Sequence, residues 1–234
     1  PPPPLSTPPP PPALYTVLTS SAASDVYKRQ DGGESWFRGS QGLVPRYLPA
    51  EAHPATYAHC VHKMLRAAQQ PETLYMQFHG GVYISEDAGR SWNDIGSGSD
   101  LPSDFGFPLA IDPADPDRAF VIPLAADIDR VTPEGRVRVF ETGDRGKSWQ
   151  ARSAGLPQRD AYLTVLRQAF CQDGLEPLGL YFGARSGQVF GSNDGGTSWR
   201  TLIDHLPPVF SIQCGDMRLS GHAGAWRRNG LAAV

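Results

Sequence analysis

The chain has 234 residues, of which 40% are hydrophobic and 19% charged, and its formal net charge is −3 at pH 7. This composition is typical of a globular chain and lacks the strongly basic balance of proteins that bind nucleic acid. The apolar runs are much shorter than the roughly 20 residues that a membrane-spanning helix needs. We therefore expect neither nucleic acid nor a membrane as a partner.

The three cysteines, Cys60, Cys171 and Cys214, are odd in number and widely spaced, which argues against a framework of disulfide bonds. Free thiols are typical of a reducing compartment, so the sequence weakly favours the cytoplasm. Glycine and proline are frequent, with 25 and 23 copies, as in chains of many short strands joined by tight turns. No cofactor is expected.

The first 30 residues are expected to lie outside the fold. Residues 1–12 are mostly proline and would form a solvated polyproline helix or stay disordered. Residues Ser20–Gln30 (SSAASDVYKRQ) match the in-frame translation of a transposon adaptor used in sequencing libraries. We interpret residues 1–30 as an artefactual segment, and we expect the protein's own N-terminus to be missing.

A short polar motif that ends in tryptophan recurs along the rest of the chain. Its full copies are SEDAGRSW (85–92), TGDRGKSW (142–149) and SNDGGTSW (192–199), and a partial copy, DGGESW, occupies 31–36. The four tryptophans follow one another at intervals of 56, 57 and 50 residues (36 to 92, 92 to 149, 149 to 199). A period of about 50 residues is typical of propellers and solenoids.

Each full copy follows stretches of β-type residues. The pairs nearest to the copies are LYMQF (74–78) and GVYIS (81–85), AFVIP (119–123) and RVRVFET (136–142), and LYFGA (180–184) and GQVFGS (187–192). Further upstream lie VHKML (61–65), PLAID (108–112) and YLTVLR (162–167), and a short strand is expected after each tryptophan. The pattern predicts an all-β fold, a β-propeller of four-stranded antiparallel blades.

The propeller is expected to occupy residues 31–214 and to be incomplete. The copies account for about three to four blades, which is an open arc with unpaired strand edges. Residues 215–234 do not follow the blade pattern, and their status is left open.

The recurring motif, S-x-D-x-G-x-[ST]-W, is expected in the hairpin between the third and fourth strands of a blade. Its Asp accepts hydrogen bonds from backbone N–H groups, its Gly adopts a left-handed conformation, and its hydroxyls bond across the loop. The Trp begins the outer strand and buries its ring against the blade. The residues with these structural roles are Asp31, Gly33, Trp36, Ser85, Asp87, Gly89, Trp92, Thr142, Asp144, Gly146, Trp149, Ser192, Asp194, Gly196 and Trp199.

The copies resemble the Asp-box, or BNR repeat, of sialidases, sortilin-type propellers and related bacterial proteins. The wider pattern, which includes CVHKML (60–65) and GLPQRDAYLTVLR (155–167), is similar to bacterial BNR-repeat propellers often labelled "glycosyl hydrolase" or "exo-alpha-sialidase-like". The resemblance extends from residue 31 to about 214 and implies the C-terminal part of a longer propeller. Asp-boxes occur in enzymes and receptors alike, on the face away from the active site, so they imply a fold and not a function.

Catalysis is not the favoured interpretation. The resemblance implies that a sialidase would need three arginines, a Tyr–Glu pair and an Asp acid/base, the first arginine in a Phe-Arg-Ile-Pro motif. The chain has Phe-Val-Ile-Pro at 120–123. We expect a module that binds a polar ligand, such as a sugar or peptide, or a protein. The alternative is a glycoside hydrolase with Asp104 or Asp160 as acid/base, Tyr162 as a further candidate, and its other residues in missing blades.

A binding site is expected where loops lead into the innermost strands, because these loops line the mouth of a propeller's channel. They hold His59, His62, Phe105 and Phe107, and Arg167 is expected along the inner strand of the last unit. Imidazole, aromatic and charged side chains together suit a polar ligand. The alternative is that the aromatic side chains plug the channel.

No metal is expected, although four histidines (His53, His59, His62 and His79) and Cys60 lie within 27 residues. Imidazole and thiolate groups suit zinc. However, His59 and His62 are three residues apart, which points them to opposite faces of a strand, and no cysteine pair or carboxylate completes a pattern. The aspartates of IDPADPD (111–117) are interleaved with prolines and are interpreted as a turn, not as a calcium site.

Overall fold

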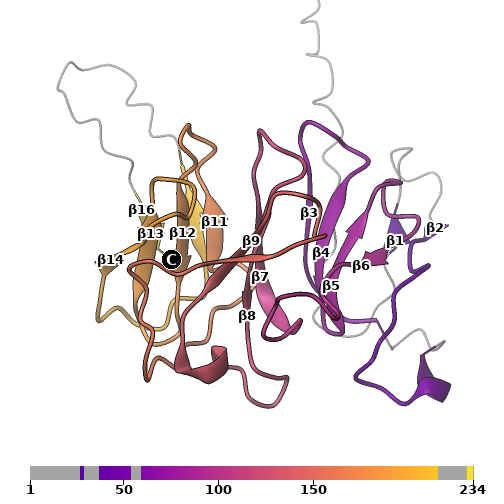
Figure 1. Cartoon of the computed structure of the whole chain (residues 1–234), viewed down its shortest axis with the longest axis horizontal. Helices are drawn as coiled ribbons and strands as arrows, with labels where there is room; N and C mark the ends of the chain where they lie inside the picture. The colour runs from indigo at the N-terminus through magenta and orange to yellow at the C-terminus, as the bar shows by residue number, and fades with distance from the viewer. Residues whose placement is uncertain (1–26, 29–36, 54–58, 216–230, 234) are drawn as a thin grey trace, which may run out of the picture.

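Short strands and tight turns make up most of the computed structural model, which describes residues 27–28, 37–53, 59–215 and 231–233 (Figure 1). Three sheets of four antiparallel strands lie side by side, and in each sheet the strands follow one another in chain order. This arrangement confirms the expected all-β fold, an incomplete β-propeller. No helix in the described ranges is long and apolar enough to cross a membrane.

The strands of the three sheets are listed here in chain order. The first sheet contains β3 (Val61–Arg66), β4 (Leu74–Phe78), β5 (Gly81–Ser85) and β6 (Asn93–Asp94). The second contains β7 (Gly106–Ile111), β8 (Ala119–Pro123), β9 (Val139–Thr142) and β10 (Gln150–Arg152). The third contains β11 (Phe170–Gln172), β12 (Leu180–Gly183), β13 (Val189–Ser192) and β14 (Arg200–Ile203).

Smaller elements complete the described chain. Strand β1 (Tyr27–Lys28) pairs with β2 (Phe37–Arg38), and β15 (Ile212–Cys214) pairs with β16 (Leu231–Ala233). Two single turns of 3-10 helix are η1 (Ala50–Ala52) and η3 (Pro133–Gly135). The pairs β1–β2 and β15–β16 therefore include residues on both sides of the expected propeller boundaries.

The core lies between neighbouring sheets, because alternate residues of the middle strands point to opposite faces. In β8, Val121 joins the apolar cluster shared with the first sheet, whereas Phe120 and Ile122 join the cluster shared with the third sheet. Strands buried on both faces read as nearly continuous apolar runs, which is why AFVIP has no polar residue and LYMQF has one, the buried Gln77.

The expected strand at 162–167 is wrong. No strand forms there, and the third sheet begins at β11 instead. The backbone of this segment bonds to the loop around η3: Thr132 N–H donates to Leu163 O (3.0 Å) and Ala161 N–H donates to Gly135 O (2.9 Å). Val165 is buried in the core as a strand residue would be. A short apolar run does not distinguish a buried loop from a strand.

The three described copies of the tryptophan motif close by the same hydrogen bonds. In the first, Gly89 N–H donates to Ser85 Oγ (2.7 Å), and Ser91 donates to Asp87 from both N–H (2.9 Å) and Oγ–H (2.6 Å). The second and third copies repeat this pattern around Asp144 and Asp194. The glycines adopt φ of 80°, 83° and 89°. The partial copy, with Asp31, Gly33 and Trp36, lies outside the described residues.

Each motif tryptophan packs against the part of the chain that precedes its own sheet. Trp92, Trp149 and Trp199 are each at most 5% exposed. The indole N–H of Trp149 donates to Ile95 O, beyond the last strand of the first sheet (2.9 Å), and its ring lies in the cluster between the first two sheets. An aromatic ring with a satisfied N–H thus fastens the second sheet onto the first.

Candidate functional site

The first strands of the three sheets, β3, β7 and β11, lie next to one another at the centre of the arc. Where they begin, side chains from the first two sheets and from the loop before β11 meet around Phe107, whose ring centroid is 4.5 Å from that of His62 and 5.4 Å from that of Phe105. The guanidinium of Arg167 lies over the same ring at 4.6 Å. We call this group the central cluster; its members are Cys60, His62, His79, Phe105, Phe107, Arg130 and Arg167.

A β-bulge places His62 in the central cluster. Val61 pairs with Phe78 of β4, but the next paired residue is Lys63, opposite Gln77, so His62 is an extra residue on β3. Bulges redirect a side chain and are common next to functional sites. The His62 ring is 2% exposed, and its Nδ1 lies 2.5 Å from the carbonyl oxygen of Gly106 on β7. This bond fixes the ring between the first two sheets.

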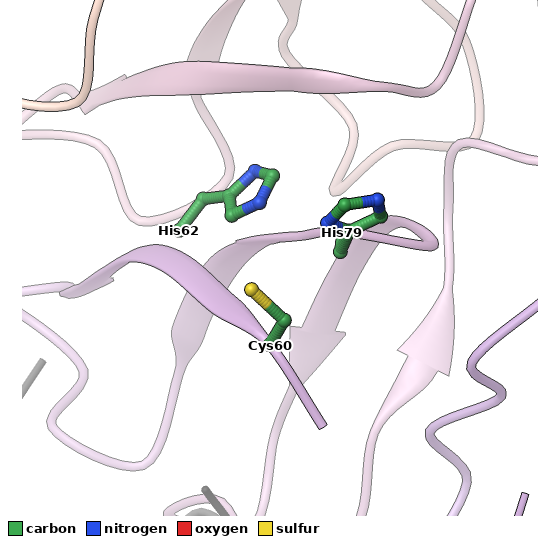
Figure 2. A group of neighbouring side chains, drawn as sticks. All are labelled: Cys60, His62 and His79. Carbon is green, nitrogen blue, oxygen red and sulfur yellow. The ribbon is translucent and has the colours of Figure 1, made fainter. Parts of the chain in front are cut away.

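Cys60 lies just before β3 and His79 just after β4, at the open end of this hairpin, and both face His62 (Figure 2). The backbone N–H of His79 donates to Cys60 O (2.9 Å), which holds the two residues opposite each other. The possible donor atoms of Cys60, His62 and His79 all lie within 4.8 Å of one another. On its other side His79 contacts the Tyr47 ring, at 4.1 Å between centroids, and the Asp127 carboxylate, at 3.3 Å from Nε2.

Burial keeps the imidazoles of the central cluster neutral. It lowers the pKa of His62 to about 3, although the bond to Gly106 opposes this effect. Burial also lowers the pKa of His79, against the opposing influence of Asp127. The pKa of Cys60 is raised by burial, while the nearby charge of Arg167 acts in the other direction. At neutral pH the cluster therefore combines two uncharged imidazoles, a thiol and two cations.

The two cations differ in their partners. Arg130 lies 5.4 Å from the Phe107 ring and forms an ion pair with Asp127 (3.1 Å). In the ranges that the structure describes, no carboxylate lies within 4 Å of the Arg167 guanidinium. Burial lowers the pKa of Arg167. Arg167 is thus a partly buried cation that lies over an aromatic ring and has no ion-pair partner among the described residues.

The other candidate residues lie apart from these contacts. Asp104 forms an ion pair with Arg46 (3.1 Å), and burial raises its pKa against the opposing effect of that arginine. His59 is buried beside Phe78, with ring centroids 6.1 Å apart. Asp160 is exposed and has φ of 52°, and Tyr162 is 62% exposed.

Of the predicted ligand-binding residues, the structure thus brings together His62, Phe105, Phe107 and Arg167. Arg167 lies in the loop before β11 and not on an inner strand, which corrects its expected position. Cys60, His79 and Arg130 complete the cluster and were not predicted as ligand-binding residues. Regular strand alternation does not predict the contact between Cys60 and His62, because Cys60 lies before β3 and His62 is at a bulge.

A surface depression of about 520 Å³ lies elsewhere. It is lined by Glu86, Asp144, Arg145 and Lys147 of two motif hairpins and by Asp117 of the turn between β7 and β8. Arg145 is already paired there with Glu86 and Asp117, both at 2.5 Å. Because its cation is compensated within the protein, this depression is a weaker candidate for a binding site than the central cluster.

No family model and no curated protein sequence matches the chain. Among solved structures, an ancestral GH74 enzyme is similar with a TM-score of 0.53 at 16% identity, over 86% of this chain and 27% of that chain. The NanB sialidase from Streptococcus pneumoniae gives a TM-score of 0.47 at 14% identity, over 82% of this chain and 30% of that chain. A GH74 xyloglucanase from Xanthomonas campestris gives 0.46 at 18% identity, over 59% and 20%.

The similarity to the GH74 enzyme shows the fold, a β-propeller, and at this identity nothing about the reaction or the ligand. The chain spans about a quarter of the length of that enzyme.

Proposed function

We propose that this chain is a binding module that recognises a carboxylate-bearing ligand, a sugar acid or a peptide with a free C-terminus, at the central cluster. The observation that carries the proposal is the partly buried guanidinium of Arg167, which lies over the Phe107 ring and has no ion-pair partner in the part of the chain that the structure describes. Propellers commonly bind ligands where their innermost strands begin, and the central cluster lies at that position.

A carboxylate would relieve the poor solvation of Arg167. Burial disfavours the charged guanidinium, as the lowered pKa of Arg167 indicates. An anion that accepts two parallel N–H bonds from an arginine replaces the lost water with charge-assisted hydrogen bonds. The ring of Phe107, 4.6 Å from the guanidinium carbon, also stabilises the cation at this position.

Binding is favoured over hydrolysis because the candidate acids are not arranged around Arg167. The Asp104 carboxylate is engaged by Arg46, and Asp160 is a solvent-exposed turn residue. One observation favours the alternative, a glycoside hydrolase: the raised pKa of Asp104 suits a general acid. The experiment below therefore includes hydrolysis as a second readout.

The test replaces Arg167 with methionine, which keeps an apolar contact with Phe107 and removes the charge. Binding of N-acetylneuraminate, glucuronate and a short peptide is measured by calorimetry, with glucose and the C-terminally amidated peptide as uncharged analogues. We expect binding of at least one carboxylate ligand that weakens about tenfold or more in Arg167→Met, since charged hydrogen bonds contribute about 1.5–3 kcal/mol.

Arg159→Met is the matched control, because Arg159 is exposed and outside the cluster. It should bind as the unaltered chain does. Equal affinity for charged and uncharged ligands, or unchanged binding in Arg167→Met, would contradict the proposal. Hydrolysis of aryl glycosides by the unaltered chain that disappears in Asp104→Asn would favour the enzyme instead.

A further inference from the structure

We propose that Cys60, His62 and His79 bind a borderline divalent metal ion of the zinc class, with three protein ligands and one open coordination position. The three residues supply one thiolate and two imidazoles, a set that suits Zn²⁺ and related ions. Figure 2 shows the sulfur and both rings turned toward a common space. This inference goes beyond ligand binding by Arg167 and does not depend on it.

The hydrogen bond of His62 to a backbone carbonyl already has the form found in metal sites. A metal-bound histidine usually donates its other ring N–H to a carboxylate or a backbone carbonyl, which selects the tautomer. Nδ1 of His62 lies 2.5 Å from the Gly106 carbonyl oxygen, so Nδ1 carries the proton and Nε2 presents its lone pair. Because the ring is buried and the carbonyl belongs to β7, this orientation is built into the packing of two sheets.

His79 has a corresponding contact with a carboxylate. Its Nε2 is buried without a hydrogen bond of good geometry, yet it lies 3.3 Å from Asp127 Oδ2. A carboxylate beside Nε2 favours the tautomer protonated there, which leaves Nδ1 for the metal. Asp127 is held in turn by Arg130 (3.1 Å). Each imidazole thus has an oxygen beside one ring nitrogen, which leaves the lone pair of the other nitrogen to bind the ion.

The spacing allows an ion to bind after small side-chain movements. The donor atoms lie within 4.8 Å of one another. A tetrahedral zinc ion with Zn–S of about 2.3 Å and Zn–N of about 2.0–2.1 Å brings its ligand atoms to roughly 3.3–3.7 Å. Cys60 and His79 lie just outside β3 and β4, so their side chains can close this difference while His62 stays fixed.

The test uses Co²⁺ as a spectroscopic substitute for Zn²⁺, added to the full chain under reducing conditions. We expect one equivalent to bind, with the intense visible bands of tetrahedral Co²⁺ and a near-ultraviolet thiolate-to-metal band, and Zn²⁺ should displace it. Cys60→Ser should abolish the thiolate band. Asp127→Asn should weaken Zn²⁺ binding about 10–100-fold, as loss of a carboxylate that hydrogen-bonds a metal-binding histidine does in other proteins.

Two controls separate the proposed site from its competitors. Cys171 and Cys214, whose sulfur atoms lie 3.2 Å apart, are the other thiols that could bind the ion. If the ion binds at Cys60, Cys171→Ser should leave the spectrum unchanged. His205, whose side chain is 92% exposed, supplies a histidine control, His205→Gln, against His79→Gln. Circular dichroism checks that each variant folds.

Absence of Co²⁺ and Zn²⁺ binding by the folded, reduced chain would overturn the inference. So would a thiolate band that survives Cys60→Ser or disappears in Cys171→Ser. Arg167→Met distinguishes this site from the carboxylate site, because it should leave the Co²⁺ spectrum intact whatever it does to carboxylate binding.

Discussion

Asp87 shows how one carboxylate closes a hairpin of this propeller. Burial would by itself raise the pKa of Asp87, but hydrogen bonds from the hydroxyl and N–H of Ser91 and from Ser85 outweigh it and lower the pKa to about 2. The pKa in the unfolded chain is near 3.9. The ionised carboxylate therefore stabilises the folded state fully above pH 4, and this contribution is lost as the pH falls toward 2.

Asp87→Asn is expected to lower the free energy of unfolding by about 1–2 kcal/mol at pH 7, because the amide cannot accept all of these bonds as a charged group. The difference between variant and unaltered chain should shrink between pH 4 and pH 2. Urea denaturation of the variant and of the unaltered chain at pH 7 and pH 3 measures the difference in the free energy of unfolding at each pH. Asp100→Asn is the control, since Asp100 is exposed; an equal loss in both variants would show that the hairpin bonds are not the cause.

At the scale of elements, the sheets are joined by close backbone contacts as well as by side chains. Trp199 N–H donates to Ala154 O (2.8 Å), which ties the third sheet to the turn after β10. Gly155, beside this bond, has φ of 86°, and a Cβ there would lie 2.0 Å from Trp199 O. A Cβ at Gly42 would likewise lie 2.1 Å from Trp92 O. Glycine is needed at these joints for both conformation and space.

Gly155→Ala is expected to lower the free energy of unfolding by about 2–4 kcal/mol, from left-handed strain together with a clash against a backbone oxygen. Gly143→Ala is the matched control, because a Cβ at Gly143 has no neighbour within 4 Å. It should change stability by less than about 1 kcal/mol. Thermal and urea denaturation measures the loss of stability in each variant. Equal losses in the two variants would show that Gly155 has no special role.

At the scale of the whole molecule, the central cluster depends on all three sheets. His62 comes from β3, Phe107 from β7 and Arg167 from the loop before β11. The third sheet also holds the segment that follows it: Val209 and Ile212 pack against Val189. Cys171 on β11 and Cys214 on β15 lie at the same junction, with their sulfur atoms 3.2 Å apart.

Oxidised glutathione should convert Cys171 and Cys214 into a disulfide, with loss of both thiol protons and release of two molecules of reduced glutathione. A hydrogen bond from Cys171 lowers the pKa of Cys214, so Cys214 is the attacking thiolate. Closing this loop should raise the free energy of unfolding by about 2–4 kcal/mol. Mass spectrometry and denaturation measure both effects.

Cys171→Ser should abolish this stabilisation, whereas Cys60→Ser should not affect it. A stable mixed disulfide of Cys214 with glutathione, in place of the internal bond, would contradict the expected pairing.

The fold was largely predictable because its strongest determinants are local. A motif such as SNDGGTSW contains the hydroxyl, the carboxylate and the glycine that close its hairpin within a few residues of one another. Repetition at about 50 residues then predicted the blades. The segment 162–167 is the exception. Val165 would be buried in a strand as it is in the observed loop, so its apolar character does not distinguish the two, and only the backbone hydrogen bonds to the loop around η3 do.

The sequence by itself determined the hairpins, the four-stranded sheets and four of the residues that meet at the centre, because short-range hydrogen bonds and side-chain periodicity are encoded in neighbouring positions. Only the tertiary structure decided that Cys60 and His79 face His62, and that Arg130 and Arg167 lie over one ring. These contacts depend on a bulge in β3 and on the stacking of separate sheets, and both follow from packing over the whole arc.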